Sequence, residues 1–170
     1  MSTRAAHLAS LDLFALAERL GRACRERGIT VTAAESCTGG GVASAITAVA
    51  GSSEWFETGY VTYSNGAKNR LLGVPEALLV EHGAVSREVV EAMVAGACRD
   101  SGAGLGVAIS GVAGPGGGSD DKPVGTVWLA WGDAEGAETE CHLYPGDRAS
   151  VREQAVREAL IGLVRRLERP

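Results

Sequence analysis

Strand-like runs and helix-like segments alternate along this sequence, and the alternation restricts the fold more than any other feature. Apolar or β-branched runs of strand length occur at residues 29–35, 55–64, 105–110, 124–132 and 138–144. Segments with apolar residues at helical spacing lie between and around these runs. Such an alternation predicts a mixed sheet that is covered by helices on both faces. We therefore expect an α/β protein, a three-layer α/β/α sandwich with a mixed sheet of about five strands.

Six helices are predicted between and around the strands. Their expected ranges are 11–28, 39–51, 65–72, 75–82, 87–100 and 148–168. Ser86 and Asp147 each stand directly before one of these segments, where a side-chain oxygen can accept from the free N–H groups of a first helical turn. The sequence DAEG at 133–136 separates the last two strands and predicts an antiparallel hairpin.

The length predicts one domain that covers residues 1–170. The chain has 170 residues, of which 45% are hydrophobic, and this is enough for one sizeable core. The stretch rich in Gly and Pro at 114–123 is the nearest candidate for a linker. Strand-like runs lie on both sides of it, so we interpret it as a loop within one sheet.

Charge and motif spacing exclude several kinds of site. The formal net charge is -5, whereas proteins that bind nucleic acids usually carry an excess of Lys and Arg. The four cysteines form no CxxC pair, and the three histidines show no HxxxH or HExxH spacing. We therefore expect no metal site and no direct contact with nucleic acid. The charged N-terminal segment resembles neither a signal sequence nor a membrane span, which predicts a cytoplasmic protein with reduced thiols and small-molecule partners.

Three polar or glycine-rich stretches directly follow predicted strands. They are ESCTGGG at 35–41, TYSNGAKNR at 62–70 and SGVAGPGGGSDDKP at 110–123. Ligands of α/β sheets usually bind at the carboxyl ends of the strands, beside helix N-termini. The three stretches together therefore predict a ligand site at that edge of the sheet.

Ser36 has two interpretations. As a nucleophile it needs a base and nearby N–H donors for the oxyanion, and the backbone of Thr38, Gly39 and Gly40 could supply the donors. Alternatively, Ser36 or Thr38 is an N-cap and the glycines allow close packing of a helix on the sheet. Spacing alone favours the capping interpretation, because the stretch matches neither GxSxG nor GxGxxG.

A serine nucleophile requires a base, and Lys68 is the candidate. The three histidines have no evident link to Ser36, and Lys68 and Lys122 are the only lysines of the chain. A lysine can act as a base only if burial or a nearby positive charge lowers its pKa from about 10.4. Tyr63, at a strand end, could relay or orient the proton. The alternative is a surface aromatic and a solvated helix charge.

The glycine-rich loop at 110–123 and Arg148 are candidates for binding a polar ligand. The backbone of the loop could surround such a ligand, or the loop could be a flexible surface segment. Arg148, at the start of the last predicted helix, could pair with a phosphate or a carboxylate. We expect Arg152 and Arg157 to be exposed helix charges.

Five stretches together resemble the CinA C-terminal domain family. They are TAAESCTGG, GSSEWFETGYVTYSNGAK, GVPEALLVEHGAVSREVVEAM, ISGVAGPGGGSDDKPVGTVW and PGDR. The similarity extends from about Leu13 to Leu163. Stand-alone members of the family are nicotinamide mononucleotide (NMN) deamidases. The resemblance therefore implies a single amidohydrolase domain that converts NMN and water to nicotinic acid mononucleotide and ammonia in pyridine nucleotide salvage, with no cofactor and no metal.

The resemblance also implies roles for individual residues. The family's nucleophile maps onto Ser36, and the residues that assist it map onto Tyr63 and Lys68. We expect the substrate to be bound by residues of the three stretches and of the PGDR block, namely Thr38, Gly39, Gly40, Ser110, Gly111, Gly114 and Arg148.

The family supplies further expectations. Longer CinA proteins carry an N-terminal domain that resembles molybdopterin-binding proteins and has a nucleotide pyrophosphatase activity; 170 residues leave no room for it, so we expect that activity to be absent. The family tends towards dimers, which implies a homodimer or a higher homo-oligomer. Three other functions stay open: a non-catalytic nucleotide-binding module, an amidase for another small substrate, and an accessory partner of competence proteins.

Overall fold

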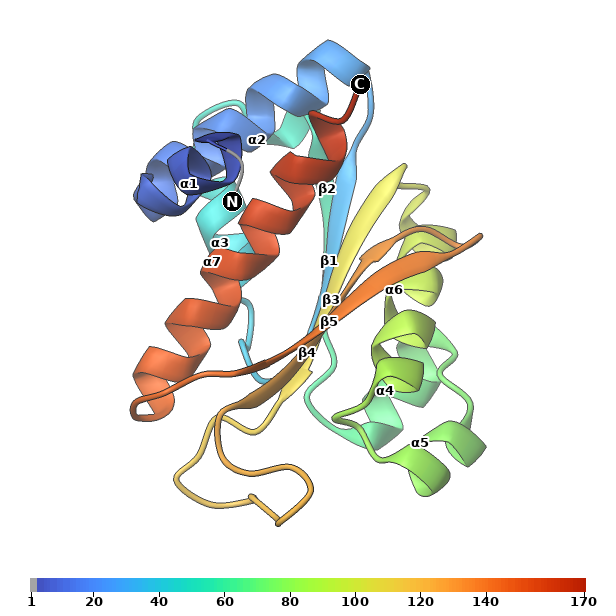
Figure 1. Ribbon diagram of the computed structural model, residues 1–170. Helices are drawn as coiled ribbons and strands as arrows, with labels where there is room; N and C mark the ends of the chain where they lie inside the picture. The colour runs from blue at the N-terminus through green and yellow to red at the C-terminus, as the bar shows by residue number, and fades with distance from the viewer. Residues whose placement is uncertain (1–2) are drawn as a thin grey trace.

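The computed structural model describes residues 3–170, whose centre is a five-stranded mixed sheet (Figure 1). The strands lie in the order β2-β1-β3-β4-β5. Their bounds are β1 Val31–Glu35, β2 Phe56–Val61, β3 Leu105–Gly111, β4 Thr126–Gly132 and β5 Ala137–Leu143. β1 pairs in parallel with β2 and β3, while the β3–β4 and β4–β5 pairs are antiparallel. The predicted fold class and the predicted hairpin are confirmed.

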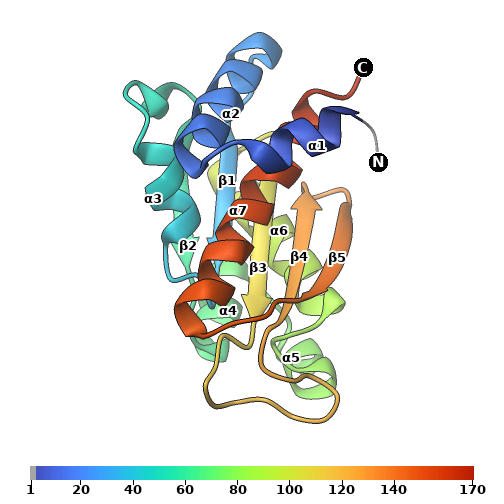
Figure 2. The same cartoon turned by 60° about the vertical axis from the view of Figure 1, so that its left-hand side comes forward.

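Helices cover both faces of the sheet, as the alternation predicts (Figures 1 and 2). One face carries α1 Thr3–Ser10, α2 Leu13–Arg27, α3 Gly41–Thr47 and α7 Arg148–Leu167. The other carries α4 Asn65–Leu72, α5 Glu76–His82 and α6 Arg87–Ser101. Ser86 and Asp147 cap α6 and α7 as predicted, because their side chains accept from the N–H groups of Val89 and Ser150.

Two helix boundaries differ from the prediction. α1 was not predicted, and α2 begins at Leu13, because the Asp12 side chain accepts from the Ala15 N–H and caps α2 there. The helix predicted to reach residue 51 ends at Thr47, and a short 3₁₀ helix, Ser52–Glu54, follows Gly51. Ala48 is the C-cap of α3, and Gly51, which has a left-handed backbone with φ of 83°, is the N-cap of the 3₁₀ helix.

The core consists of two hydrophobic clusters, one on each side of the sheet. The larger lies between the sheet and α1, α2, α3 and α7, and it contains Trp55, Trp131 and Leu160. The smaller lies under α4, α5 and α6, around Val90 and Met93. Because helices cover both faces, the interior strand β1 is buried along its whole length and shows no polar alternation.

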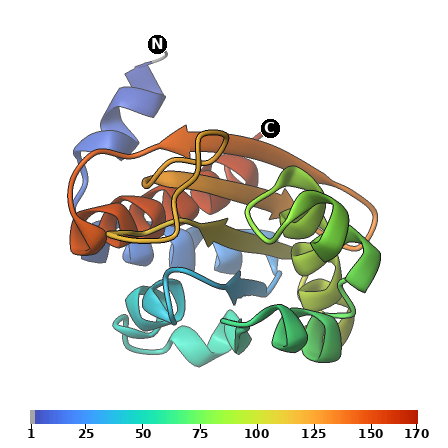
Figure 3. The ribbon, with the colours of Figure 1, turned by 90° about the horizontal axis from the view of Figure 1, so that it is seen from below.

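The topology brings three connections to one edge of the sheet. β1, β2 and β3 run in parallel, so the segments that follow them leave at the same edge, which Figure 3 shows from below. The chain turns from β1 to β2 on one side, whereas β3 lies on the other side of β1. This is a switch point, the position at which open α/β sheets form ligand crevices.

Candidate active site

The segment directly after β1 is a tight turn that holds Ser36 at the sheet edge. The Ser36 N–H donates to the Ile109 carbonyl of β3 at 3.0 Å, and the Gly39 N–H donates to the Ser36 carbonyl at 3.0 Å. Gly39 and Gly40 have φ values of 58° and 104°, in the left-handed region that favours glycine. We call residues 36–40, which carry the candidate nucleophile Ser36, the nucleophile turn.

Glu35, and not Ser36 or Thr38, caps α3. Its carboxylate accepts from the Val42 N–H at 2.8 Å and the Ala43 N–H at 3.1 Å, and also from the Thr38 hydroxyl at 2.7 Å. The backbone cap residue, Gly40, has no side chain for this role. The capping interpretation of Ser36 is therefore wrong, and its hydroxyl is available for other contacts.

Lys68 contacts Ser36 from α4, which covers the face of the sheet opposite to α3 and α7. Its Nζ donates to Ser36 Oγ at 2.8 Å and to the Thr62 carbonyl at 2.9 Å, and the side chain is only 1% exposed. Burial lowers the pKa of Lys68 from 10.5, because the charged ammonium is desolvated while only neutral oxygens contact it. A lysine in this state can accept the proton of the serine that it contacts.

Tyr63 is not hydrogen-bonded to Lys68. Its ring is 60% exposed, and its hydroxyl accepts from Arg148 Nη2 at 2.8 Å. Arg148 Nη1 also donates to the Gly114 carbonyl at 2.9 Å, so the guanidinium joins the segment after β2 to the glycine-rich loop after β3. The structure thus pairs Tyr63 with Arg148, where the sequence pattern paired it with Lys68.

A cavity of about 320 Å³ lies over these groups. Seven of the ten predicted site residues line it: Ser36, Tyr63, Lys68, Ser110, Gly111, Gly114 and Arg148. Thr38, Gly39 and Gly40 are not among the lining residues; the Thr38 hydroxyl donates to Glu35 and the Gly39 N–H donates to the Ser36 carbonyl. Their contact with the substrate stays a prediction.

Three functional candidates were missed by reasoning from the sequence. Glu35 lies directly before the nucleophile, Cys37 lines the cavity, and Arg152 donates to the carbonyls of Cys37 and Thr38. Arg152 was expected to be an exposed helix charge, and the only sequence signal that linked it to Arg148 was a spacing of one helical turn. Burial raises the pKa of the Cys37 thiol to about 11, so the thiol stays protonated at neutral pH and is a poor nucleophile.

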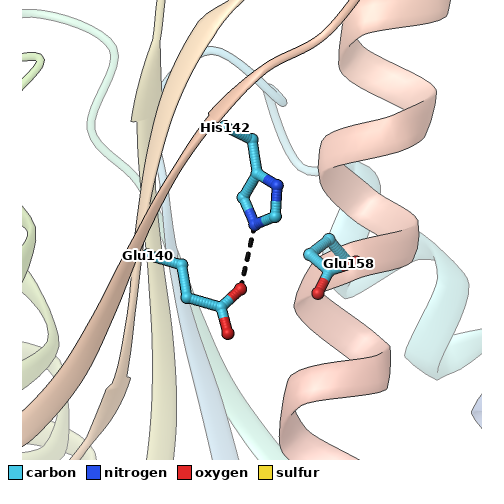
Figure 4. Close-up of side chains that lie close together, drawn as sticks. All are labelled: Glu140, His142 and Glu158. Atoms are coloured by element: carbon cyan, nitrogen blue, oxygen red, sulfur yellow. Dashed lines mark hydrogen bonds and ion pairs between the residues drawn. The ribbon is translucent and has the colours of Figure 1, made fainter. Parts of the chain in front are cut away.

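One cluster among residues 3–170 has ligand types that suit a metal, and it lies outside this cavity. Glu140 and His142 on β5 face Glu158 on α7, with ligand atoms within 4.8 Å of one another (Figure 4). His142 Nε2 lies 2.9 Å from a Glu140 oxygen, and Glu158 forms an ion pair with Arg165 at 3.9 Å. His142 thus pairs with Glu140 within β5, and Glu158 pairs with Arg165 within α7, so each of the three side chains has a partner without a metal. No helix within the described part of the chain is long and apolar enough to span a membrane.

The fold and the site define an α/β protein with a buried serine–lysine pair in a cavity at the carboxyl edge of its sheet. The sequence model of the CinA C-terminal domain matches residues 13–167, and the chain belongs to this family.

The similar proteins carry two kinds of name. Nicotinamide-nucleotide amidohydrolase PncC of Pseudomonas putida is 62% identical over 149 residues, which are 88% of this chain and 93% of that protein. The PncC protein of Escherichia coli K12 is 54% identical over 152 residues, or 88% and 91% of the two chains. A crystal structure of a competence-damaged protein (CinA) superfamily protein from Klebsiella pneumoniae 700603 superposes with a TM-score of 0.89 at 42% identity, covering 92% of this chain and 98% of that one.

Proposed function

We propose that this protein is a nicotinamide-nucleotide amidohydrolase that hydrolyses NMN to nicotinic acid mononucleotide and ammonia. Relatives named for this activity are 62% and 54% identical and match nearly their whole length. The observation that carries the proposal is the 2.8 Å contact between Lys68 Nζ and Ser36 Oγ inside the cavity.

The proposed reaction uses Ser36 as the nucleophile and neutral Lys68 as the base. Ser36 Oγ bonds to the carboxamide carbon while its proton moves to Lys68 Nζ. The tetrahedral intermediate then breaks its C–N bond, and the proton on Lys68 goes to the leaving nitrogen, which departs as ammonia. Water, activated by Lys68, attacks the remaining ester, and Ser36 leaves with its proton restored.

The oxyanion of this reaction needs backbone donors close to Ser36. The Gly39 N–H is already used within the nucleophile turn. We assign the Cys37 N–H as one donor, because Cys37 directly follows the nucleophile and lines the same cavity. In this scheme Ser36 is the nucleophile and Lys68 is the base, so no step requires a metal.

Arg148 is the residue we assign to the phosphate of NMN. Arg148 and Lys68 are the two cationic side chains among the residues that line the cavity, and Lys68 is committed to Ser36. The backbone of Gly111 and Gly114, with the Ser110 side chain, would surround the nucleotide. Tyr63 then holds the Arg148 guanidinium in place and does not relay a proton.

The experiment that tests the activity measures ammonia and nicotinic acid mononucleotide released from NMN by the purified protein in the presence of EDTA. We expect the two products in equal amounts, unaffected by chelation, and unchanged activity in Lys122→Ala, the other lysine of the chain. NMN binding without release would indicate a nucleotide-binding module. Neither binding nor release would indicate an amidase for another substrate, and salt-sensitive DNA binding would indicate a competence-related role.

Three further expectations stay predictions. They are a homodimer or higher homo-oligomer, a cytoplasmic location and the absence of direct contact with nucleic acid. Light scattering of the purified protein tests the first, and a DNA-binding titration at low salt tests the third.

A further inference from the structure

Arg152 contacts the nucleophile turn but has no part in the reaction as written above. It lies on α7, one helical turn after Arg148. Its Nε donates to the Cys37 carbonyl at 3.1 Å, and its Nη2 donates to the Thr38 carbonyl at 3.3 Å. A single guanidinium thus holds the two consecutive carbonyls that follow Ser36.

Holding these carbonyls also fixes the N–H groups of the turn. In a trans peptide the carbonyl of one residue and the N–H of the next point in opposite directions. The contacts of Arg152 with the Cys37 and Thr38 carbonyls therefore set the orientation of the Thr38 and Gly39 N–H groups. The Gly39 N–H points to the Ser36 carbonyl, so the guanidinium supports the bond that closes the turn.

Gly39 in the turn and Gly41 at the start of α3 allow this close approach of α7. A Cβ atom on Gly39 would lie 3.2 Å from Arg152 Nη2, and one on Gly41 would lie 2.8 Å from a methyl group of Val156. Arg152 and Val156 are one turn apart on the same face of α7. The helix therefore packs directly on the segment that carries Ser36.

Glu35 holds the turn from the other side. Glu35 is only 1% exposed. Its carboxylate accepts from the Thr38 hydroxyl and from two N–H groups of α3. All three partners are donors, so a carboxylate satisfies them where a neutral amide would place a donor against a donor. Arg152 acts on the carbonyls of the turn, and Glu35 acts on its hydroxyl and on the helix that follows.

We propose that Arg152 is a positioning residue for the hydrolysis, which acts with Glu35 to hold Ser36 Oγ in line with Lys68 and to fix the peptide groups around the oxyanion. This inference rests on the proposed function. Loss of the guanidinium would leave Ser36 and Lys68 present but free to separate, and catalysis depends steeply on such distances.

The test compares Arg152→Ala with Arg157→Ala as a matched control. Arg157 is on the same helix and also donates to two carbonyls, those of Ala9 and Leu11, but these lie in the last turn of α1 and directly after it, away from the cavity. We expect kcat for NMN to fall about 10- to 100-fold in Arg152→Ala, with KM changed less than about threefold. Arg157→Ala should keep the wild-type kcat, whatever it does to the urea midpoint of unfolding.

Two further measurements separate positioning from a general loss of structure. Free guanidinium at a concentration below its denaturing range should restore part of the kcat of Arg152→Ala and none of that of Lys68→Ala. Arg152→Lys should also be impaired, because one ammonium cannot reproduce the two directed bonds of the fork. If Arg152→Ala does not fold, Arg152→Lys carries the test.

The outcomes distinguish this inference from the proposed function. A wild-type protein that releases ammonia from NMN, together with an Arg152→Ala variant of unchanged kcat, would overturn the positioning role alone. So would a raised KM at constant kcat, since that would make Arg152 a substrate-binding residue. A wild-type protein without activity on NMN would refute the proposed function, and the positioning role would fall with it.

Discussion

At the scale of single residues, the proposed chemistry depends on a lysine that is buried without an acidic partner. The Lys68 Nζ contacts a hydroxyl and a carbonyl, and neither carries a charge that would hold the ammonium form. The nearest thiol, Cys37, has its pKa raised by burial to about 11 and offers no thiolate at neutral pH. Desolvation therefore dominates and favours the neutral amine that a general base requires.

The pH dependence of the reaction follows from this shift. A plot of kcat/KM against pH should rise as Lys68 loses its proton, and the midpoint should lie below the ordinary lysine pKa of 10.5. Lys68→Arg, which stays protonated, should lose about 100-fold or more in activity together with this rise. Steady-state kinetics over pH tests both statements. The same rise in the Arg variant would contradict the assignment of Lys68 as the base.

Some of these residues can be read from the sequence and others cannot. Lys68 stands out because the chain has only two lysines, and Ser36 because it follows a predicted strand. Arg152 and Arg157 are both charged residues within the predicted last helix, between its apolar positions. The spacing of residues does not show which backbone carbonyls each guanidinium contacts. Glu35 looks like the last residue of a strand, although it caps the next helix.

At the scale of elements, the position of Lys68 depends on how closely α4 approaches α6. Gly96 lies in the middle of α6, and a Cβ atom there would be 1.9 Å from the Leu72 carbonyl oxygen at the end of α4. This oxygen belongs to the backbone, so it cannot move away unless α4 itself moves. α4 is also the helix that carries Lys68.

Gly96→Ala should therefore destabilise the protein and reduce activity together. We expect the free energy of unfolding to fall by about 1–3 kcal/mol, because overpacking forces the two helices apart. Gly136→Ala is the control, since nothing lies within 4 Å of the added Cβ there and its backbone is unstrained. Urea unfolding measures the difference. An equal effect at both positions would argue against a close helix contact.

The elements themselves follow largely from local sequence. Caps at Ser86 and Asp147 and the period of apolar residues locate α6 and α7, and β-branched runs locate the strands. α1 was missed because it is only eight residues long and buries a single side chain, Leu8. The end of α3 at Thr47 was missed because the run of small and apolar residues continues without a break to Gly51.

At the scale of the whole molecule, α7 links the reaction site to the opposite end of the chain. Its first turns carry Arg148 and Arg152, while Glu168 at its C-terminus accepts from Arg19 of α2 at 2.7 Å and 2.8 Å. Arg4 adds a looser ion pair with Glu168 at 3.8 Å. The strand order and these long-range contacts come from tertiary packing and could not be read from local patterns.

The bond between Arg19 and Glu168 should contribute to stability in a pH-dependent way. The Arg19 side chain lowers the pKa of Glu168 below 4.5, so the folded state releases this proton more readily than the unfolded chain. The contribution is present above pH 4.5 and is lost as the pH falls through the lowered pKa. We expect Glu168→Gln to lower the free energy of unfolding at pH 7 by about 1 kcal/mol.

Urea unfolding of Glu168→Gln at several pH values checks this expectation. The difference from wild type should shrink in acid, and Glu153→Gln, at an exposed position of the same helix, should show none. A difference that does not change with pH would contradict the ionic origin of the contribution.

The most direct test of the central claim is the rate of ammonia release from NMN by Ser36→Ala beside wild type. The serine–lysine scheme predicts that the rate falls by about three orders of magnitude or more, while NMN binding by calorimetry and the urea midpoint stay near their wild-type values. Ammonia release by Ser36→Ala at a rate close to that of wild type would contradict the scheme.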